Sequence, residues 1–430
     1  MRLPLAPNEV QGRRTLHVAT RSAPVVLTPA WPVFVVAAFL CTLTAGGLTG
    51  ALDLWTLRVA HNAVPLDHAR GHALAQVFGF LGLFTMGISL HLAPRFFGAG
   101  PPSRAFTRAL TWLGVGGVAL AIVGRLGALV PGSAWFGLVG VGAVLAAKTL
   151  WASMLVGFWR ELPGPKDTLQ RFLVAGVGWW WLAAVTLLGW QLGQSFGGPG
   201  ASIPLEAVWA PALFGGVASW LWGIFFRAGI CTLHVPRPPE RAQRRLFLAW
   251  QPAAALMVCA SWAQVPLLDA LAGGAMACAV GLLWWTVRPF SGEVGDGGAL
   301  QPRAVQAGLG FLLVFAALEL WVALSALGVW APVLLRDAAR HAFTLGGAVL
   351  LVLGFAGRMV PGFRGVGLRW PRVYDAGVMA LMLGATLRLG ELFSARAGLA
   401  LAGASGGLAF LGLALAATSL LGSLRLKPAA

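Results

Sequence analysis

Charged residues are scarce in this chain. Asp, Glu, Lys and Arg make up only 10% of its 430 residues, whereas 58% are hydrophobic. A soluble domain of this length needs many polar side chains to face water, and it cannot hide so much apolar surface behind so few charges. The composition excludes a soluble globular protein and predicts an integral membrane protein.

Several other features are absent from the sequence. The longest loops, about 229–245 and 289–303, are too short for a separate soluble domain. The four cysteines have no metal-type spacing, and we expect them to be buried free thiols. No nucleotide-binding loop, nucleophile elbow or zinc-hydrolase signature is found. Residues 1–30 are polar and basic without a short apolar core, so no signal peptide is evident.

Long apolar stretches are abundant instead. A run of about 18 or more apolar residues is long enough to cross the hydrocarbon core as a helix. Irregular backbone in lipid would leave polar groups without partners, so we predict an all-α membrane bundle. It would form one domain over 31–421, between a cytoplasmic segment 1–30 and a cytoplasmic tail 422–430. The predicted spans are 31–54, 70–93, 108–129, 135–157, 173–195, 206–228, 246–267, 270–288, 304–330, 341–360, 373–392 and 398–421.

The net charge of +17 is distributed unevenly between the predicted loops. With the N-terminus inside, 23 Lys and Arg residues fall on inner segments and 6 on outer ones. This is the positive-inside pattern, and it predicts a multi-pass protein of the bacterial inner membrane with both termini in the cytoplasm. The lipid bilayer thus accounts for the charge, and no nucleic-acid partner is expected because no soluble basic region exists.

Three of the predicted helices share one spacing of glycines and end in a basic residue. Their glycines are offset by 136 and 131 residues, or four spans each, which predicts a threefold duplication of a four-helix unit. The three copies are Phe78-Gly79, Gly87 and His91; Phe214-Gly215, Gly223 and Arg227; and Leu345-Gly346, Gly354 and Arg358.

Two histidines lie near the starts of the second and tenth spans. The topology places His72 and His341 at one depth, at the outer ends of their helices. Neutral imidazoles from facing helices are suitable axial ligands for a haem iron. His91 lies nineteen residues after His72, about 28 Å along the helix, so these two cannot share a metal.

Other basic residues are secondary candidates. Arg70, Arg336 and Arg340 belong to the same outer face and could pair with haem propionates, because a guanidinium matches a carboxylate. His68 is expected at the membrane interface, with contact to a metal as the alternative. For the repeat residues His91, Arg227 and Arg358 we favour cytoplasmic anchors.

Two charges, Lys148 and Glu319, lie within predicted spans. Intramembrane charges are costly and usually have a partner or a task. Either the two meet inside the bundle, or Glu319 is a protonatable site in a relay. Together with the internal repeats they support an alternative function, a secondary transporter.

Parts of the sequence resemble the NnrS family, membrane haem proteins linked to nitric oxide and denitrification. The stretch His72-Ala73-Leu74-Ala75-Gln76-Val77-Phe78-Gly79-Phe80 is similar to the family's His-Ala-His-Glu-Met-Leu-Phe-Gly-Phe. The stretch His341-Ala342-Phe343-Thr344-Leu345-Gly346 is similar to its His-Ala-Leu-Thr-Val-Gly element. These motifs cover about a tenth of the chain.

A wider resemblance is to the catalytic subunits of haem–copper oxygen and nitric oxide reductases. It implies twelve spans in threefold pseudo-symmetry and a low-spin haem held by histidines of helices two and ten. The sequence departs from both families. Leu74 and Ala75 replace a second His and a Glu, Phe363 and Arg364 lie where a later histidine would fall, and helices six and seven have no histidines. These departures argue against a copper site.

The leading hypothesis is therefore a membrane haem b protein of nitric oxide or respiratory redox metabolism. It would bind a diatomic gas such as nitric oxide or pass an electron, with a redox partner or further subunit that the sequence does not identify. A nitric oxide or oxygen reductase with an unusual active site is the third and least favoured option, and whether the chain is an enzyme stays open.

Overall fold

Helices make up the protein, seen in a computed structural model that describes residues 30–60, 65–126, 132–197, 200, 203–292, 300–332, 334–393 and 395–426. No strand occurs among these residues. The predicted N-terminal segment, apart from Ala30, and the last four residues of the predicted tail lie outside them.

Several membrane-spanning helices consist of consecutive α and π (η) segments. In chain order, the elements are α1 (Trp31–Cys41), η1 (Thr42–Gly46), α2 (Gly47–Ala60), α3 (Leu66–Leu74), η2 (Ala75–Gly82), α4 (Leu83–Phe97), α5 (Arg104–Thr111), η3 (Trp112–Gly116), α6 (Gly117–Leu126), α7 (Ser133–Glu161), α8 (Thr168–Phe196), α9 (Leu205–Ala210), η5 (Pro211–Val217), α10 (Ala218–Ile224), η6 (Phe225–Gly229), α11 (Ile230–Leu233), α12 (Glu240–Ala263), α13 (Pro266–Val287), α14 (Gln301–Ala326), α15 (Leu335–His341), η7 (Ala342–Val349), α16 (Leu350–Phe363), α17 (Pro371–Gly390), the 3₁₀ segment η8 (Glu391–Phe393) and α18 (Ala395–Ser423).

Twelve helices among the described residues are long and apolar enough to cross a membrane, and they match the twelve predicted spans. The chain is thus a multi-pass membrane protein with an all-α fold. Most helices begin a few residues before their apolar cores, because polar ends such as Arg104 and Glu240 continue the helix beyond the apolar stretch. The short turn predicted between spans seven and eight is confirmed: α12 ends at Ala263 and Pro266 starts α13, where its missing N–H costs nothing.

Spans two, six and ten form the interior of the bundle. In their most apolar stretches 83, 100 and 78% of residues are buried, compared with 33–50% in the other nine spans found among the described residues. Each contains a π segment, and the segments η2, η5 and η7 begin at equivalent positions, 136 and 131 residues apart. The three copies therefore share a local backbone feature as well as a sequence pattern.

The repeat glycines explain how the inner helices pack. A Cβ at Gly79, Gly215 or Gly346 would lie within 2.8 Å of a side chain on the preceding span, and real carbon atoms do not approach so closely. Those neighbours are Cys41, Trp179 and Phe311 respectively. Each inner helix thus approaches spans one, five or nine through the same glycine. This equivalent packing supports the predicted duplication.

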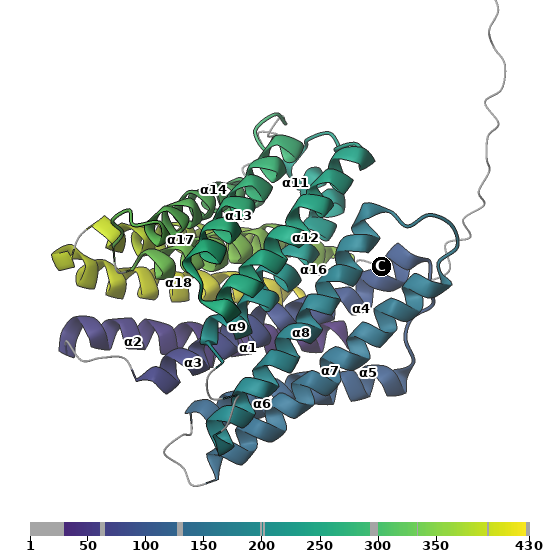
Figure 1. Ribbon diagram of the computed structural model, residues 1–430. Coiled ribbons are helices and arrows are strands. Elements are labelled where there is room, and N and C mark those ends of the chain that lie inside the picture. Colours follow the sequence, from purple (N-terminus) through teal and green to yellow (C-terminus); the bar gives the residue numbers. More distant parts are fainter. Residues whose placement is uncertain are drawn as a thin grey trace, which may run out of the picture.

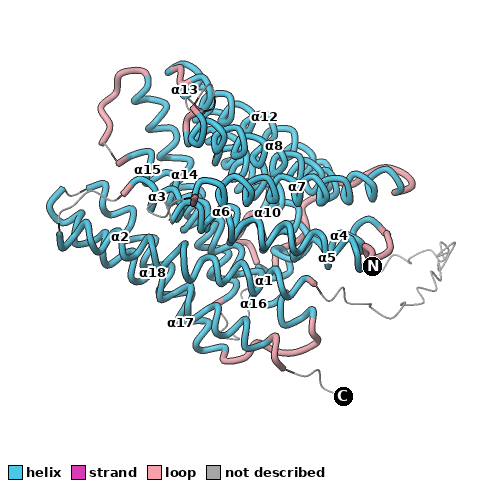
Figure 2. Tube along the Cα trace, turned by 90° about the horizontal axis from the view of Figure 1, so that it is seen from below, coloured by secondary structure: helices cyan, strands magenta, loops and turns pink. Residues whose placement is uncertain are grey.

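The chain closes on itself, because the first and last spans pack together. In Figure 1, α2 and α18, which come from opposite ends of the sequence, lie side by side. The tube in Figure 2 shows that the helices are joined mostly by short loops. Span twelve is thereby brought next to span one, and Phe363 at the end of span ten contacts Trp31 of span one and His91 of span two.

The expectation of buried cysteines is wrong for three of the four. Cys231, Cys259 and Cys278 are exposed on the bundle surface, and only Cys41 is partly buried. A thiol is a weakly polar, small apolar group, so an outward position in a membrane helix costs it little.

Candidate functional site

His72 lies on α3 and is turned toward the first span. Its Nδ1 is 2.8 Å from the backbone carbonyl oxygen of Gly46, so this nitrogen carries the proton and donates. A Cβ at Gly50 would lie 2.6 Å from the imidazole ring. Two small residues, one helical turn apart, therefore form a seat for the ring. This arrangement directs Nε2 away from the hydrogen bond.

His341 is held in the same way at the end of α15. Its Nδ1 is 2.9 Å from the carbonyl oxygen of Asp337 and 3.3 Å from the carboxylate of the same residue. Both acceptors face one nitrogen, which fixes the tautomer and leaves Nε2 without a hydrogen-bond partner among the described residues. Metal-binding histidines commonly donate their second ring N–H to a carbonyl or carboxylate in this manner.

The two histidines belong to one electrostatic neighbourhood. His341, Asp53 and Arg388 are the charged or titratable groups whose fields act on His72. His72 and His341 therefore lie at the same end of the inner helices, and their pairing on one iron stays a prediction. We call the end of the bundle that carries both residues the histidine end.

A network of ion pairs holds Asp337, the residue that contacts Nδ1 of His341. Arg388 of α17 contacts the Asp337 carboxylate at 2.7 Å and the Glu391 carboxylate at 2.6 Å. Ser405 of α18 donates to the second oxygen of Glu391 at 3.1 Å. Because these partners come from spans ten, eleven and twelve, the network ties the orientation of His341 to the packing of three helices.

The three arginines predicted to hold propionates all have carboxylate partners. Arg336 contacts Asp269 at 2.6 Å and Arg340 contacts Glu206 at 3.3 Å, so they extend toward spans eight and six. Arg70 contacts Asp67 at 3.4 Å, and its guanidinium carbon lies 5.3 Å from the Trp190 ring centre on span five. Arg388, not predicted as a site residue, is the arginine whose charge acts on His72.

The secondary histidines differ in environment. His68 is half exposed, and its Nδ1 lies 3.2 Å from a carboxylate oxygen of Asp53, which suits an interfacial residue. His91 is only 5% exposed, and its ring centre lies 4.1 Å from that of Phe363. Its Nε2 is buried without a hydrogen-bond partner among the described residues. His91 is therefore not a water-facing anchor, in contrast to the prediction.

The other two repeat residues of this position reach the bundle surface at the opposite end. Arg227 is exposed and contacts a carboxylate oxygen of Asp167, the N-cap of α8, at 2.9 Å. Arg358 is exposed and donates to the carbonyl oxygen of Cys231 at 3.2 Å. Their positions are those of anchors at helix ends.

Lys148 and Glu319 do not meet. The Lys148 amine is buried among apolar groups, 3.3 Å from the Met86 sulfur and 4.2 Å from the centre of the Trp180 ring. Glu319 is half-buried on α14, and the charges that act on it come from Arg336, Asp269 and Arg340. The alternative in which the two charges pair inside the bundle is wrong.

The donor set at the histidine end fits a haem. Two imidazoles each offer one nitrogen, and Nε of Arg388 and of Arg70 are buried N–H groups without partners in the described part of the chain. Unpaired buried donors are costly, and a carboxylate of a bound group would satisfy them. No group of three or more His, Cys, Asp or Glu residues capable of holding a metal ion occurs in the described ranges. A haem needs only two axial side chains, so that finding concerns bare metal ions.

Sequence reasoning missed the residues that orient the imidazoles. Asp337 was detectable, because it precedes His341 by four residues and therefore lies on the same helix face. Gly46, Gly50 and Arg388 gave no local signal, since their roles depend on how spans one and eleven pack.

In comparisons with known proteins, no family model and no curated protein matches this chain.

Proposed function

We propose that this protein is a membrane haem b protein with His72 and His341 as its axial ligands. The observation that supports this most directly is the common hydrogen bonding of the two rings. Each Nδ1 donates to a backbone carbonyl, so each Nε2 has the tautomer required of a ligand. Two histidines at the same end of the bundle share this hydrogen-bonding pattern, which simple bridging between helices would not require.

When bound, the haem would supply one-electron chemistry, and a diatomic gas would bind to it only in place of one of the two imidazoles. The chain itself orients the ligands: the Gly46 carbonyl and the Gly50 surface hold His72, and Asp337 holds His341. Arg388 supplies positive charge beside both, which suits the carboxylates of a haem b. The resemblance to the NnrS family supports a role in nitric oxide or respiratory redox metabolism.

The proposed location is the bacterial inner membrane, with both termini in the cytoplasm and the histidine end on the outer side. The bias of 23 inner to 6 outer basic residues supports this orientation. The transporter alternative has weaker support, because the repeat has three four-helix units and not two six-helix halves.

An optical spectrum of the purified protein, oxidised and reduced, tests the proposal. We expect bands of a b-type haem in the wild type, altered bands in His72→Ala and His341→Ala, and loss of haem in the double variant. His68→Ala serves as a matched control, since this half-exposed ring pairs with Asp53 one turn before His72, and it should keep the wild-type spectrum. A colourless wild-type protein, or full haem content in the double variant, would contradict the proposal.

A further inference from the structure

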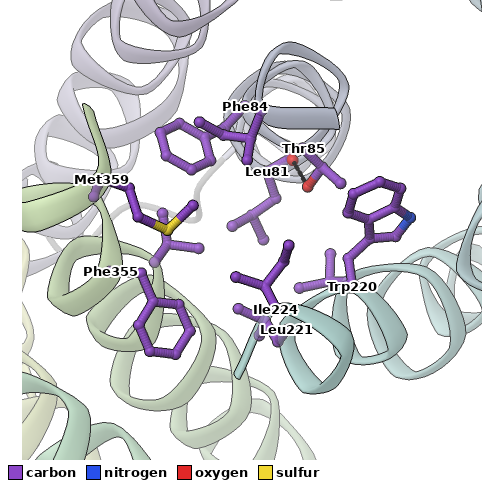
Figure 3. Close-up of a pocket in the computed structure, with 12 residues that line it drawn as sticks. Leu81, Phe84, Thr85, Trp220, Leu221, Ile224, Phe355 and Met359 are labelled. Carbon is purple, nitrogen blue, oxygen red and sulfur yellow. Dashed lines mark hydrogen bonds between the residues drawn. The ribbon is translucent and has the colours of Figure 1, made fainter. Parts of the chain in front are cut away.

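A cavity of about 40 Å³ lies where the three inner helices meet. Figure 3 shows side chains from three separate helices pointing into this space. Its lining contains residues at equivalent positions of the repeat, separated by 136 and 131 residues. These sets are Thr85, Leu221 and Val352, and Ile88, Ile224 and Phe355. The cavity therefore lies on the pseudo-threefold axis of the bundle.

The walls of the axial cavity offer almost nothing to a polar molecule. The Thr85 hydroxyl already donates to the Leu81 carbonyl at 2.6 Å. The Trp220 ring nitrogen lies on the side of the ring away from the cavity in Figure 3, and a Cβ at Gly176 of α8 would be 3.1 Å from it. The remaining lining side chains are apolar. A buried water needs two to four polar partners, so the cavity is a poor site for water.

The size of the cavity limits its occupant. One water-sized sphere needs at least about 10–15 Å³ in the same measure, so there is room for roughly three. An acyl chain or a quinone ring is much larger. We infer that the axial cavity binds a small apolar gas molecule of about two heavy atoms, the size of dioxygen or nitric oxide.

The cavity is distinct from the histidine end. Leu81, its first lining residue on span two, follows His72 by nine residues, or about 14 Å of helix rise. On span ten, Val352 follows His341 by eleven residues. None of the residues that orient the imidazoles lines the cavity. The inference therefore does not depend on the proposed haem and can be tested without it.

Xenon is a suitable probe, because it is apolar, of similar size and strongly scattering. We expect crystals of the full-length protein under xenon pressure to show an anomalous peak on the axis between Ile88, Ile224 and Phe355. Ala356→Met, which extends a buried lining side chain into the space, should abolish this peak. Leu383→Ala, a change at an exposed position of α17, is the matched control and should leave the peak unchanged.

A second variant is needed because Ala356→Met could also lose the xenon peak by misfolding. Ile224→Ala enlarges the cavity and should raise xenon occupancy at a given pressure. Absence of a wild-type peak, a peak that persists in Ala356→Met, occupancy unchanged in Ile224→Ala, or ordered water or an acyl chain on the axis would overturn the inference. Each of these results is independent of haem content, so a failed haem proposal would not be mistaken for a failed gas site.

Discussion

Titratable side chains lie at two places where the repeat copies meet. Polar groups surround them at one place, and apolar and aromatic groups at the other. Where the third copy meets the first, His72 and His341 are backed by carbonyls, a carboxylate and an arginine. Where the first copy meets the second, Lys148 is surrounded by Met86 and the faces of Trp151 and Trp180. We call these the histidine seam and the lysine seam.

The difference separates oriented side chains from a side chain that is merely buried. In each imidazole of the histidine seam, Nδ1 has a hydrogen-bond partner and Nε2 has none among the described residues. The ring orientation is therefore set, and Nε2 can accept a bond in one direction. The amine in the lysine seam has no carboxylate within 4 Å among the described residues and makes only weak contacts with sulfur and ring faces. Our proposal therefore rests on the supporting hydrogen bonds and not on burial and charge alone.

The largest effect is expected in the lysine seam. Lys148→Met removes an amine from the middle of α7 and keeps an unbranched apolar side chain, so the insertion cost disappears and part of the cation–π energy is lost. We expect a net gain of about 2.5 kcal/mol in the free energy of unfolding, with haem content unchanged. Denaturation in detergent measures the first quantity and the reduced spectrum the second. If Lys148→Met lost its haem, the lysine seam would also contribute to haem binding, and the two seams would no longer differ in function.

Glycine-to-alanine changes compare the tightness of the two seams. In the histidine seam, a Cβ at Gly50 would be 2.6 Å from the His72 ring, so Gly50→Ala must displace the ring and should cost about 2 kcal/mol. In the lysine seam, the Cβ of Gly82→Ala would be 3.2 Å from the Val77 carbonyl oxygen and 3.4 Å from the Lys148 amine, and the cost should be smaller. Unfolding midpoints of both variants provide the measurement. Equal losses would show that Gly50 has no special relation to His72.

The carboxylate behind His341 provides a smaller and more specific test. Asp337→Asn keeps the backbone acceptor but removes the charge that Arg388 holds beside Nδ1. We expect haem affinity to fall about tenfold, which corresponds to about 1.4 kcal/mol. Haem titration of the apoprotein measures the change. Asp269→Asn is the control. It removes the ion pair between Asp269 of α13 and Arg336 of α15, and it should bind haem normally. Equal affinities in the two variants would argue against a positioning role for Asp337.

The smallest effect is expected for an ion pair outside both seams. Arg336 is 56% exposed, and its contact with Asp269 is open to solvent or headgroups. Arg336→Gln should cost only about 0.5 kcal/mol of stability, because solvent screens such pairs. It should also leave the haem spectrum unchanged. A clear loss of haem would instead favour the predicted pairing of Arg336 with a propionate.

The predicted positions of the spans were accurate because membrane insertion is a local property of about twenty residues. The short turn at Pro266 was likewise readable from proline placement. Glycine spacing marked spans two, six and ten as related, but their position inside the bundle appeared only in the structure. Predictions about partners fared differently. Pairing of Lys148 with Glu319 was wrong, because two charges in separate helices carry no local sign of whether those helices touch.

The order of apolar and polar segments was enough to specify twelve crossings, three related units and two histidines near equivalent helix ends. Hydrophobic length and periodic glycines act within single helices, so they are legible in the chain alone. The folded bundle decided the rest: that α2 and α18 close the ring, that Gly46 and Gly50 seat one imidazole, and that Arg388 reaches Asp337 behind the other. The hydrogen-bonded pairs are 26 and 51 residues apart, and α2 and α18 come from opposite ends of the chain, so only the packing of helices onto one another brings these groups together.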